Sequence, residues 1–331
     1  MKHNLDAVVS VSSSIEQAKI PARSQLAPKS LVYSKSGRGL VRKIREKVIE
    51  FILFLAAFMS VLVTVGIAAI LISESIPFFK EVSLRQFITD VEWTPLFAEA
   101  RYGIRPLLAG TLVTTFVALF VAIPVGSIAA IYLSEYAPAR VREIVKPVLE
   151  LLSAVPTVVY GYFALLFVTP ALQKLMPELP GFNMLSAGLV MGVMIIPYVS
   201  SLSEDAMRSV PMYLREGSYA MGATRLQTAL SVVVPSAFSG ITAAYILAIS
   251  RAVGETMIVA IAAGMQPTLT LNPLDSASTI TAYIVQVSMG DLPHGSIGYQ
   301  TIFAAGLTLL LMTLLFNVIG HFMRKRFRET Y

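Results

Sequence analysis

The chain contains 331 residues, of which 55% are hydrophobic and only 14% are charged. Soluble domains carry roughly a quarter charged residues, so this composition excludes a globule with a solvated surface and also a disordered chain. It also excludes a nucleic-acid-binding chain, despite a net charge of +6. The absence of cysteine excludes disulfides, thiolate metal sites and a cysteine nucleophile. The three histidines, His3, His294 and His321, are too scattered to form a paired metal site.

Six apolar runs are long enough to cross a bilayer, which takes about 20 residues at about 1.5 Å per residue. In chain order they occupy residues 51–73, 107–133, 147–173, 182–203, 226–250 and 300–323. The first run begins beyond residue 50 and has no small-residue cleavage site after it, so it is not a signal peptide. The sequence therefore predicts an all-α integral membrane protein with six transmembrane helices.

Lysine and arginine are concentrated on one side of this predicted topology. They gather before the first run, between runs two and three, between runs four and five, and after the sixth. Short basic segments remain in the cytoplasm, so we expect both termini to be cytoplasmic. Trp93, in the segment after the first run, is expected at the outer membrane interface, where aromatic rings favour the headgroup zone.

The segment between the fourth and fifth runs is too long and too apolar for an ordinary polar loop. Pro211 suits a helix start because its missing N–H costs nothing there. We expect a short amphipathic helix over residues 211–221, with its apolar side chains available to bury, ended by Gly222, which permits a sharp turn. A second short helix is expected over residues 223–230, before Pro235 opens the fifth span.

The spacing in this segment resembles the coupling loop of ABC importer permeases. Glu216, Gly217 and Ser218 are followed after three residues by Gly222, and after nine more by Val232, Val234 and Pro235. The family pattern is Glu-Ala-Ala, three residues, Gly, nine residues, Ile-x-Leu-Pro. The chain departs from it at Gly217 and Ser218, and glycine lowers helix propensity by about 1 kcal/mol. In that family the short helix docks on the ATPase. The resemblance therefore implies a coupling role for six residues, Glu216, Gly217, Ser218, Ala220, Gly222 and Pro235.

Two further blocks resemble the phosphate importer permeases of the PstC type. They are residues 156–161 and residues 251–257, the second of which ends in Gly-Glu-Thr-Met. The PstA partner permease tends to carry Gly-Glu-Thr-Ala-Pro instead. The similarity extends over roughly residues 45–325 and implies the type I permease fold in a bacterial inner membrane, in contact with lipid.

The same resemblance implies several partners. They are a PstA-like second permease, a PstB-like ATPase dimer that uses ATP and Mg²⁺, and an external PstS-like phosphate-binding protein. No cofactor on this chain itself and no nucleic-acid partner are expected. The implied organisation is a flexible basic cytoplasmic extension (1–47), a first transmembrane helix with an outer loop (48–106), an ABC transmembrane type-1 domain (107–323) and a basic tail (324–331).

Arg251 and Glu255 form the candidate site for the transported anion. Counted from Pro235 along a straight helix, Arg251 lies about 24 Å in, within the outer half of a roughly 30 Å hydrocarbon core. A lone arginine there costs at least about 2.5–3.5 kcal/mol, so it needs a partner or water. Glu255, four residues later, would share its helix face. The guanidinium could bind phosphate through paired hydrogen bonds, with Glu255 neutralising the empty site. A structural ion pair, or an arginine that reaches outward to the interface, remains an alternative.

Other functions stay open at this point. The chain has no Gly-Lys pair and hence no phosphate-binding loop for ATP, and it shows no nucleophile with a base. It is thus expected to be a pore subunit and not an enzyme. An ATP-independent secondary anion transporter, an importer of another oxyanion such as sulfate, molybdate or phosphonate, and an additional signalling role are the alternatives. Whether the fifth span breaks at Gly254 is also open.

Overall fold

The computed structural model describes residues 38–97, 99–290, 292–293 and 295–326, with side chains from residue 42 onward. Most of the expected 1–47 extension and part of the 324–331 tail lie outside these residues. The chain divides into two units, residues 1–63 and residues 64–331. In the first unit the described part is helical and belongs to α2 (Arg38–Glu81), and its described apolar side chains up to Val63 are exposed.

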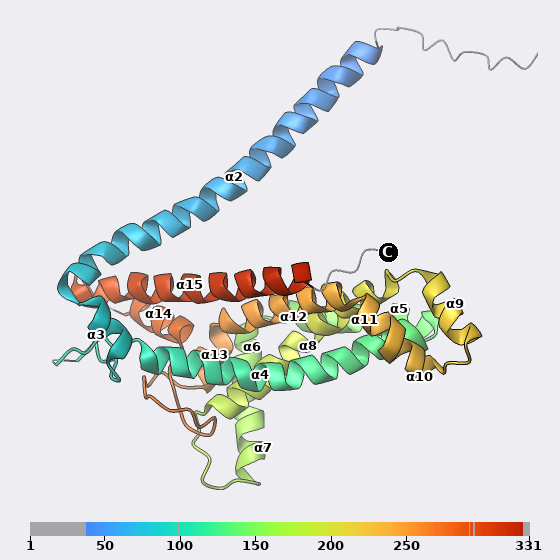
Figure 1. Cartoon of the computed structure of the whole chain (residues 1–331). Helices are drawn as coiled ribbons and strands as arrows, with labels where there is room; N and C mark the ends of the chain where they lie inside the picture. Colours follow the sequence, from blue (N-terminus) through green and yellow to red (C-terminus); the bar gives the residue numbers. More distant parts are fainter. Residues whose placement is uncertain (1–37, 98, 291, 294, 327–331) are drawn as a thin grey trace, which may run out of the picture. The chain divides into compact units, whose positions relative to one another are not determined.

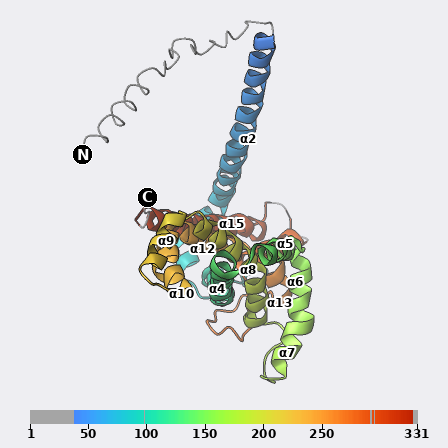
Figure 2. The same cartoon turned by 90° about the vertical axis from the view of Figure 1, so that its right-hand side faces the viewer.

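Four long helices form the centre of the second unit. They are α4 (Arg105–Ile131), α8 (Met184–Arg208), α12 (Phe238–Val253) and α15 (Ile297–Arg326). Helix α8 packs against α4 and α12, and α12 packs against α15 (Figures 1 and 2). Glycines permit the close approach of α8 to α4, since Gly188 lies against Val117 and Gly192 against the Ala118 carbonyl.

Two of the predicted spans are bent. Helix α5 (Ala139–Ala154) makes an angle of 87° with the segment Thr157–Gln173, which contains α6 (Thr157–Phe163), η2 (Ala164–Val168) and α7 (Thr169–Gln173). The span expected over residues 147–173 is therefore bent, with α5 before the bend and α6 after it. Proline explains the break, because Pro156 disfavours a helical conformation at Val155, which is extended.

The fifth span bends by 74° at Ala237, between Arg225–Ser236 and α12. Its first part comprises α10 (Arg225–Thr228), η3 (Ala229–Val233) and α11 (Val234–Ser236). Four described helices are long and apolar enough to span a membrane, and the number rises to six when each bent pair counts as one span. The expected six-span helical architecture is therefore confirmed.

Shorter elements complete the described part of the chain. They are α3 (Leu84–Thr89), η1 (Tyr132–Tyr136), α9 (Met212–Ala220), α13 (Met257–Ala262) and α14 (Ile280–Ser288). No strand is found among the described residues, although Trp93 and Tyr102 form one isolated bridge. Trp93 is fully buried and packs edge-on against Phe87 and Tyr283. Its ring therefore contacts other aromatic side chains and does not face lipid headgroups.

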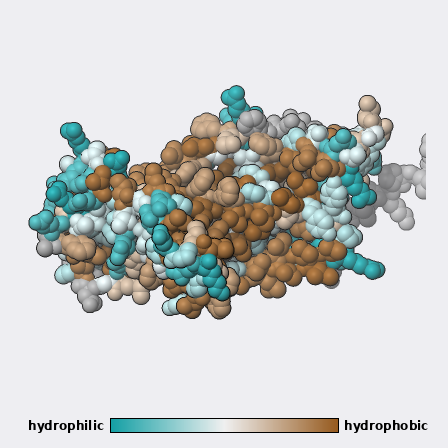
Figure 3. All heavy atoms as spheres, turned by 90° about the horizontal axis from the view of Figure 1, so that it is seen from below, coloured by the Kyte–Doolittle hydropathy of each residue, from teal (hydrophilic) through white to brown (hydrophobic). Residues whose placement is uncertain are grey.

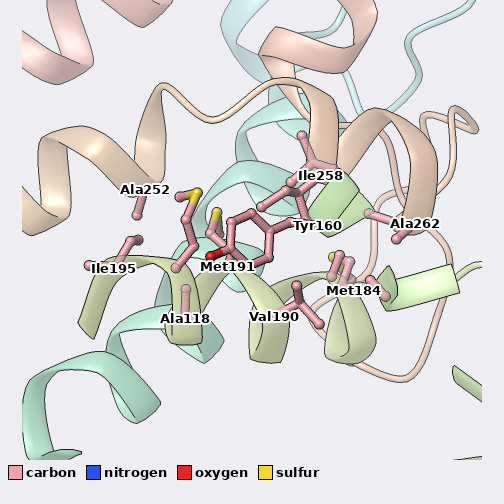
Figure 4. Packing of buried hydrophobic residues seen from close by; sticks show 14 of the residues in the cluster. Ala118, Tyr160, Met184, Val190, Met191, Ile195, Ala252, Ile258 and Ala262 are labelled. Atoms are coloured by element: carbon pink, nitrogen blue, oxygen red, sulfur yellow. The ribbon is translucent and has the colours of Figure 1, made fainter. Parts of the chain in front are cut away.

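A hydrophobic core holds α6, α8, α12 and α13 together. Tyr160 of α6 lies among Met191 of α8, Ala252 of α12 and Ile258 of α13 (Figure 4). Its hydroxyl donates a hydrogen bond to the Leu152 carbonyl of α5 at 2.6 Å, which satisfies the polar end of the ring. This core fixes the chain on both sides of the break between α12 and α13.

One face of the second unit shows how its polarity is distributed. Hydrophobic residues cover most of the middle of the face, and hydrophilic residues gather at both ends (Figure 3). An apolar band bounded by polar ends is the surface that a bilayer requires.

Candidate functional site

The helix of the fifth span has a second break, which follows two residues after Arg251. Helix α12 ends at Val253, the chain turns at Gly254 and Glu255, and α13 begins at Met257. The Glu255 carboxylate caps α13, because its Oε1 accepts hydrogen bonds from the N–H groups of Met257 and Ile258 at 3.2 and 3.4 Å. The Thr281 hydroxyl donates to the Glu255 carbonyl at 2.6 Å. These contacts hold the break in one conformation.

Arg251 and Glu255 form an ion pair across this break. The distance from Arg251 Nη2 to Glu255 Oε2 is 3.7 Å, longer than a hydrogen bond. The Glu255 side chain is 3% exposed, whereas the Arg251 side chain is 38% exposed. The expected pairing is thus present, but the expected cause is wrong, since the helix ends between the two residues and they do not share a helix face.

The guanidinium of Arg251 has unused donors. Its Nε is buried without a hydrogen-bond partner. Within the described chain the remaining guanidinium nitrogens donate no hydrogen bond either. A guanidinium carries five N–H donors in a fixed plane, so this one can bind an oxyanion without first breaking a hydrogen bond.

The expected depth of Arg251 changes with the bend of the fifth span. The count of 24 Å assumed a straight helix from Pro235, but the chain turns by 74° at Ala237. Counted from Phe238, where α12 begins, Arg251 lies about 20 Å along the helix. It therefore lies in the last turn of α12, next to the break.

The short helix expected over residues 211–221 is present as α9 (Met212–Ala220). Pro211 is its N-cap, and Gly222, with φ of +83°, ends it in the left-handed region that favours glycine. The second short helix is also found, as α10 with a capping box between Thr224 and Gln227. It continues into the π-helical turns of η3. Helices α9 and α10 lie at the end of the second unit away from α3 (Figure 1).

Much of α9 is left uncovered by the described residues of the chain. Met212 and Tyr213 are 61% and 60% exposed, and Met221, just after the helix, is 89% exposed. Glu216 and Gly217 are exposed as well. The other predicted coupling residues lie nearby: Ala220 at the end of α9, and Pro235 in α11, both exposed. Large apolar side chains exposed together are typical of surfaces that contact another protein or a membrane.

Ser218 links α9 to α10. Its hydroxyl lies 2.9 Å from the Thr228 hydroxyl, at hydrogen-bond distance. Thr228 is fully buried. The serine that departs from the family's alanine therefore joins the two short helices, which an alanine could not do.

Arg215 ties α9 to the transmembrane helices and was missed from the sequence. Its Nη2 donates to Glu135 Oε1 at 3.0 Å and to the Met207 carbonyl at 2.9 Å, and its Nη1 donates to the Val210 carbonyl at 2.6 Å. The side chains of Arg215 and Glu135 are only 10% and 4% exposed. Glu135 lies in η1, which continues α4, and Met207 lies in α8. Arg215 thus connects the exposed helix to two spans at once.

A third buried carboxylate, that of Glu204, joins α5 to α8. Glu204 is fully buried, and its oxygens lie 2.8 Å from Lys146 Nζ and 3.4 Å from Arg208 Nη1. Lys146 also pairs with Asp205 at 2.5 Å. In the sequence these carboxylates fell just beyond the predicted fourth span, and the 58 residues between Glu204 and its lysine hid the pairing. Across the described ranges no group of acidic or histidine side chains could hold a metal ion.

The fold and these two sites define a multi-pass helical membrane protein with a coupling-type loop. Residues 122–329 match the family model described as "Binding-protein-dependent transport system inner membrane component". The chain is 37% identical to the probable ABC transporter permease protein YqgH of Bacillus subtilis, over 74% of this chain and 79% of that protein. It is 33% identical to the phosphate transport system permease protein PstC 1 of Mycobacterium tuberculosis, over 74% and 82%. It is 30% identical to PstC of Haemophilus influenzae, over 83% and 92%.

Solved structures agree on the fold. A bacterial ABC transporter that imports alginate superposes with a TM-score of 0.61 at 17% identity, over 88% of this chain and 99% of that chain. The MetNI methionine transporter gives a TM-score of 0.51 at 19% identity, over 69% and 95%. The chain therefore belongs to the inner-membrane permease family of binding-protein-dependent ABC importers, and within it to the PstC type. Permeases of this family are pore components and not enzymes.

Proposed function

We propose that this chain is the permease subunit of an ATP-driven importer that carries inorganic phosphate. The observation that carries the proposal is the guanidinium of Arg251, which lies beside the helix break with its Nε buried and unpaired. The relatives from Mycobacterium tuberculosis and Haemophilus influenzae, named as phosphate transport permeases, support phosphate as the anion.

In this proposal Arg251 receives phosphate from the external side and Glu255 releases it. Phosphate oxygens match the planar donors of a guanidinium and can accept two parallel hydrogen bonds. Glu255 is held in place by the N–H groups of α13 and cannot turn away from the arginine. Its charge, 3.7 Å from Arg251, balances the empty site and limits how tightly the anion is held.

The energy comes from another chain. We infer that α9 docks on an ATPase dimer of the PstB kind, which uses ATP and Mg²⁺, through Met212, Tyr213 and Glu216. Gly217, Ser218, Ala220, Gly222 and Pro235 would shape and anchor this docking segment. A PstA-like permease and an external PstS-like phosphate-binding protein complete the proposed importer.

The proposed orientation places α9 and both termini in the cytoplasm, as the positions of lysine and arginine favour. The proposed organisation keeps residues 107–323 as the permease domain, preceded by the basic extension 1–47 and the segment 48–106, and followed by the tail 324–331. The matching family is binding-protein-dependent by description, which supports an external delivery protein.

Replacement of Arg251 tests this proposal. Hydrogen bonds to charged groups contribute roughly 1.5–3 kcal/mol each, so losing two in Arg251→Gln is expected to slow phosphate uptake by about a hundredfold or more. The measurement is uptake of radiolabelled phosphate by cells, with assembly checked by recovery of the ATPase. Arg85→Gln, the same change at an exposed residue of α3, is the matched control.

Normal phosphate uptake by Arg251→Gln would overturn the assignment of this arginine. Uptake of sulfate, molybdate or phosphonate is measured in parallel. If the wild-type chain carried one of these anions in place of phosphate, the importer mechanism would stand and the proposed substrate would be wrong.

A further inference from the structure

A basic pocket lies away from both sites described above, between the first turn of α12 and the last turns of α15. It is lined by Ser239, Gly240, Ala243, His321, Arg324 and Lys325. The two helices pack against each other, and Gly320 allows this contact because a Cβ at this position would collide with the Ile246 side chain. The pocket opens where this close packing ends.

The described charged residues of the pocket are all basic. His321, Arg324 and Lys325 line it, and no carboxylate of the described residues does. Arg324 and Lys325 form no ion pair with any residue of the described ranges. Ser239 adds a hydroxyl, and the 16-residue helix α12 begins here with the positive end of its dipole. These groups favour a phosphate or another anion.

The depth of the pocket in the membrane identifies the source of that anion. The face of α15 that is turned away from the rest of the protein carries exposed apolar side chains up to Phe322 and Met323, which are 65% and 42% exposed. Basic residues follow directly, from Arg324 to Arg326. Lipid chains cover apolar surface, and lipid phosphates lie where it ends and basic side chains begin.

We propose that this pocket binds the phosphate group of an anionic phospholipid. The acyl chains of that lipid would lie along the exposed apolar face of α15. The headgroup phosphate would accept hydrogen bonds from Arg324 and Lys325, and from the Ser239 hydroxyl. The site would tether α12, which carries Arg251 at its other end, to the membrane surface.

Native mass spectrometry of the purified full chain tests this proposal. The probes are phosphatidylglycerol, phosphatidylcholine and inorganic phosphate, each titrated onto delipidated protein. We expect retained phosphatidylglycerol, weaker retention of phosphatidylcholine, and no displacement of phosphatidylglycerol by millimolar inorganic phosphate. Arg324→Gln should weaken phosphatidylglycerol binding by about five- to tenfold, as expected for one charge close to a lipid phosphate.

Arg326→Gln is the matched control, because it removes the same charge two residues later from a side chain that does not line the pocket. We expect it to change binding by less than about twofold. Equal losses in the two variants would overturn the proposal by showing only general attraction to basic residues. Equal retention of the two lipids, or displacement by inorganic phosphate, would overturn the assignment to an anionic lipid. Both arginines are exposed, so folding is expected to be unaffected.

Discussion

The two oxygens of the Glu255 carboxylate have different partners, and this separates its structural role from its electrostatic one. Oε1 accepts hydrogen bonds from the start of α13, and Oε2 faces Arg251 at 3.7 Å. A glutamine keeps an acceptor for the helix and removes the charge that opposes the arginine. An alanine removes both.

We therefore expect Glu255→Gln to fold like the wild type and to transport phosphate slowly, because Arg251 would hold the anion without compensation. Glu255→Ala should in addition lose about 1 kcal/mol of stability with the cap. Thermal unfolding of the purified chain and the maximal rate of phosphate uptake in cells separate the two effects. Uptake at the wild-type rate in both variants would show that the charge of Glu255 has no part in transport.

At the scale of the element, α9 is a short helix that is exposed on one side and hydrogen-bonded to the transmembrane helices on the other through Arg215. The hydrogen bonds of Arg215 reach Glu135 next to α4 and the Met207 carbonyl in the last turn of α8. A displacement of α9 would therefore be transmitted directly to two transmembrane helices through Arg215. Such a connection is what coupling of ATP hydrolysis to transport requires.

Removal of this connection should uncouple the importer. Breaking one partner of a buried ion pair costs about 3–5 kcal/mol, so Arg215→Gln and Glu135→Gln are expected to loosen α9. In the assembled complex in proteoliposomes, we expect ATP hydrolysis to continue while phosphate uptake per ATP falls severalfold. Arg225→Gln, at an exposed arginine of α10 with no ion pair in the described chain, is the control. A proportional fall of hydrolysis and uptake would contradict this role and indicate lost assembly.

Two glycines of the coupling loop provide a matched pair of substitutions. A Cβ added to Gly217 or to Gly222 would meet no atom within 4 Å, so neither position is crowded. Only Gly222 has a positive φ, of +83°. Gly217→Ala should stabilise α9 by about 1 kcal/mol through helix propensity, and Gly222→Ala should cost about 1–2 kcal/mol through backbone strain.

Limited proteolysis of the loop in the purified chain measures both effects. We expect cleavage near residue 217 to slow in Gly217→Ala and to accelerate in Gly222→Ala. The same change in both variants would contradict the assignment of Gly222 as the residue that requires the left-handed turn.

At the scale of the whole molecule, local rules predicted the apolar elements well. Long apolar runs revealed the spans, and Pro211 with Gly222 marked both ends of α9. Pro156 indicates the bend between α5 and α6, which was not predicted, because a proline disfavours helix in the residue before it. The bend at Ala237 has no proline directly after it and so could not be predicted in this way.

Pairings across the sequence could not be predicted in the same way. Arg215 and Glu135 are 80 residues apart, and only the fold brings them together. Arg251 and Glu255 were found as a pair because they are close in sequence, although the helix between them ends. Spacing alone could not show that the carboxylate also caps α13.

The most direct test of the account is affinity purification of this chain from its own membranes, with its companions identified by mass spectrometry. We predict recovery of an ATPase, a second six-span permease and a phosphate-binding protein. A parallel purification of Glu216→Lys, with the charge reversed on the exposed side of α9, should lose the ATPase and keep the second permease. Recovery of the wild-type chain alone, even after cross-linking, would contradict the account and favour an ATP-independent transporter.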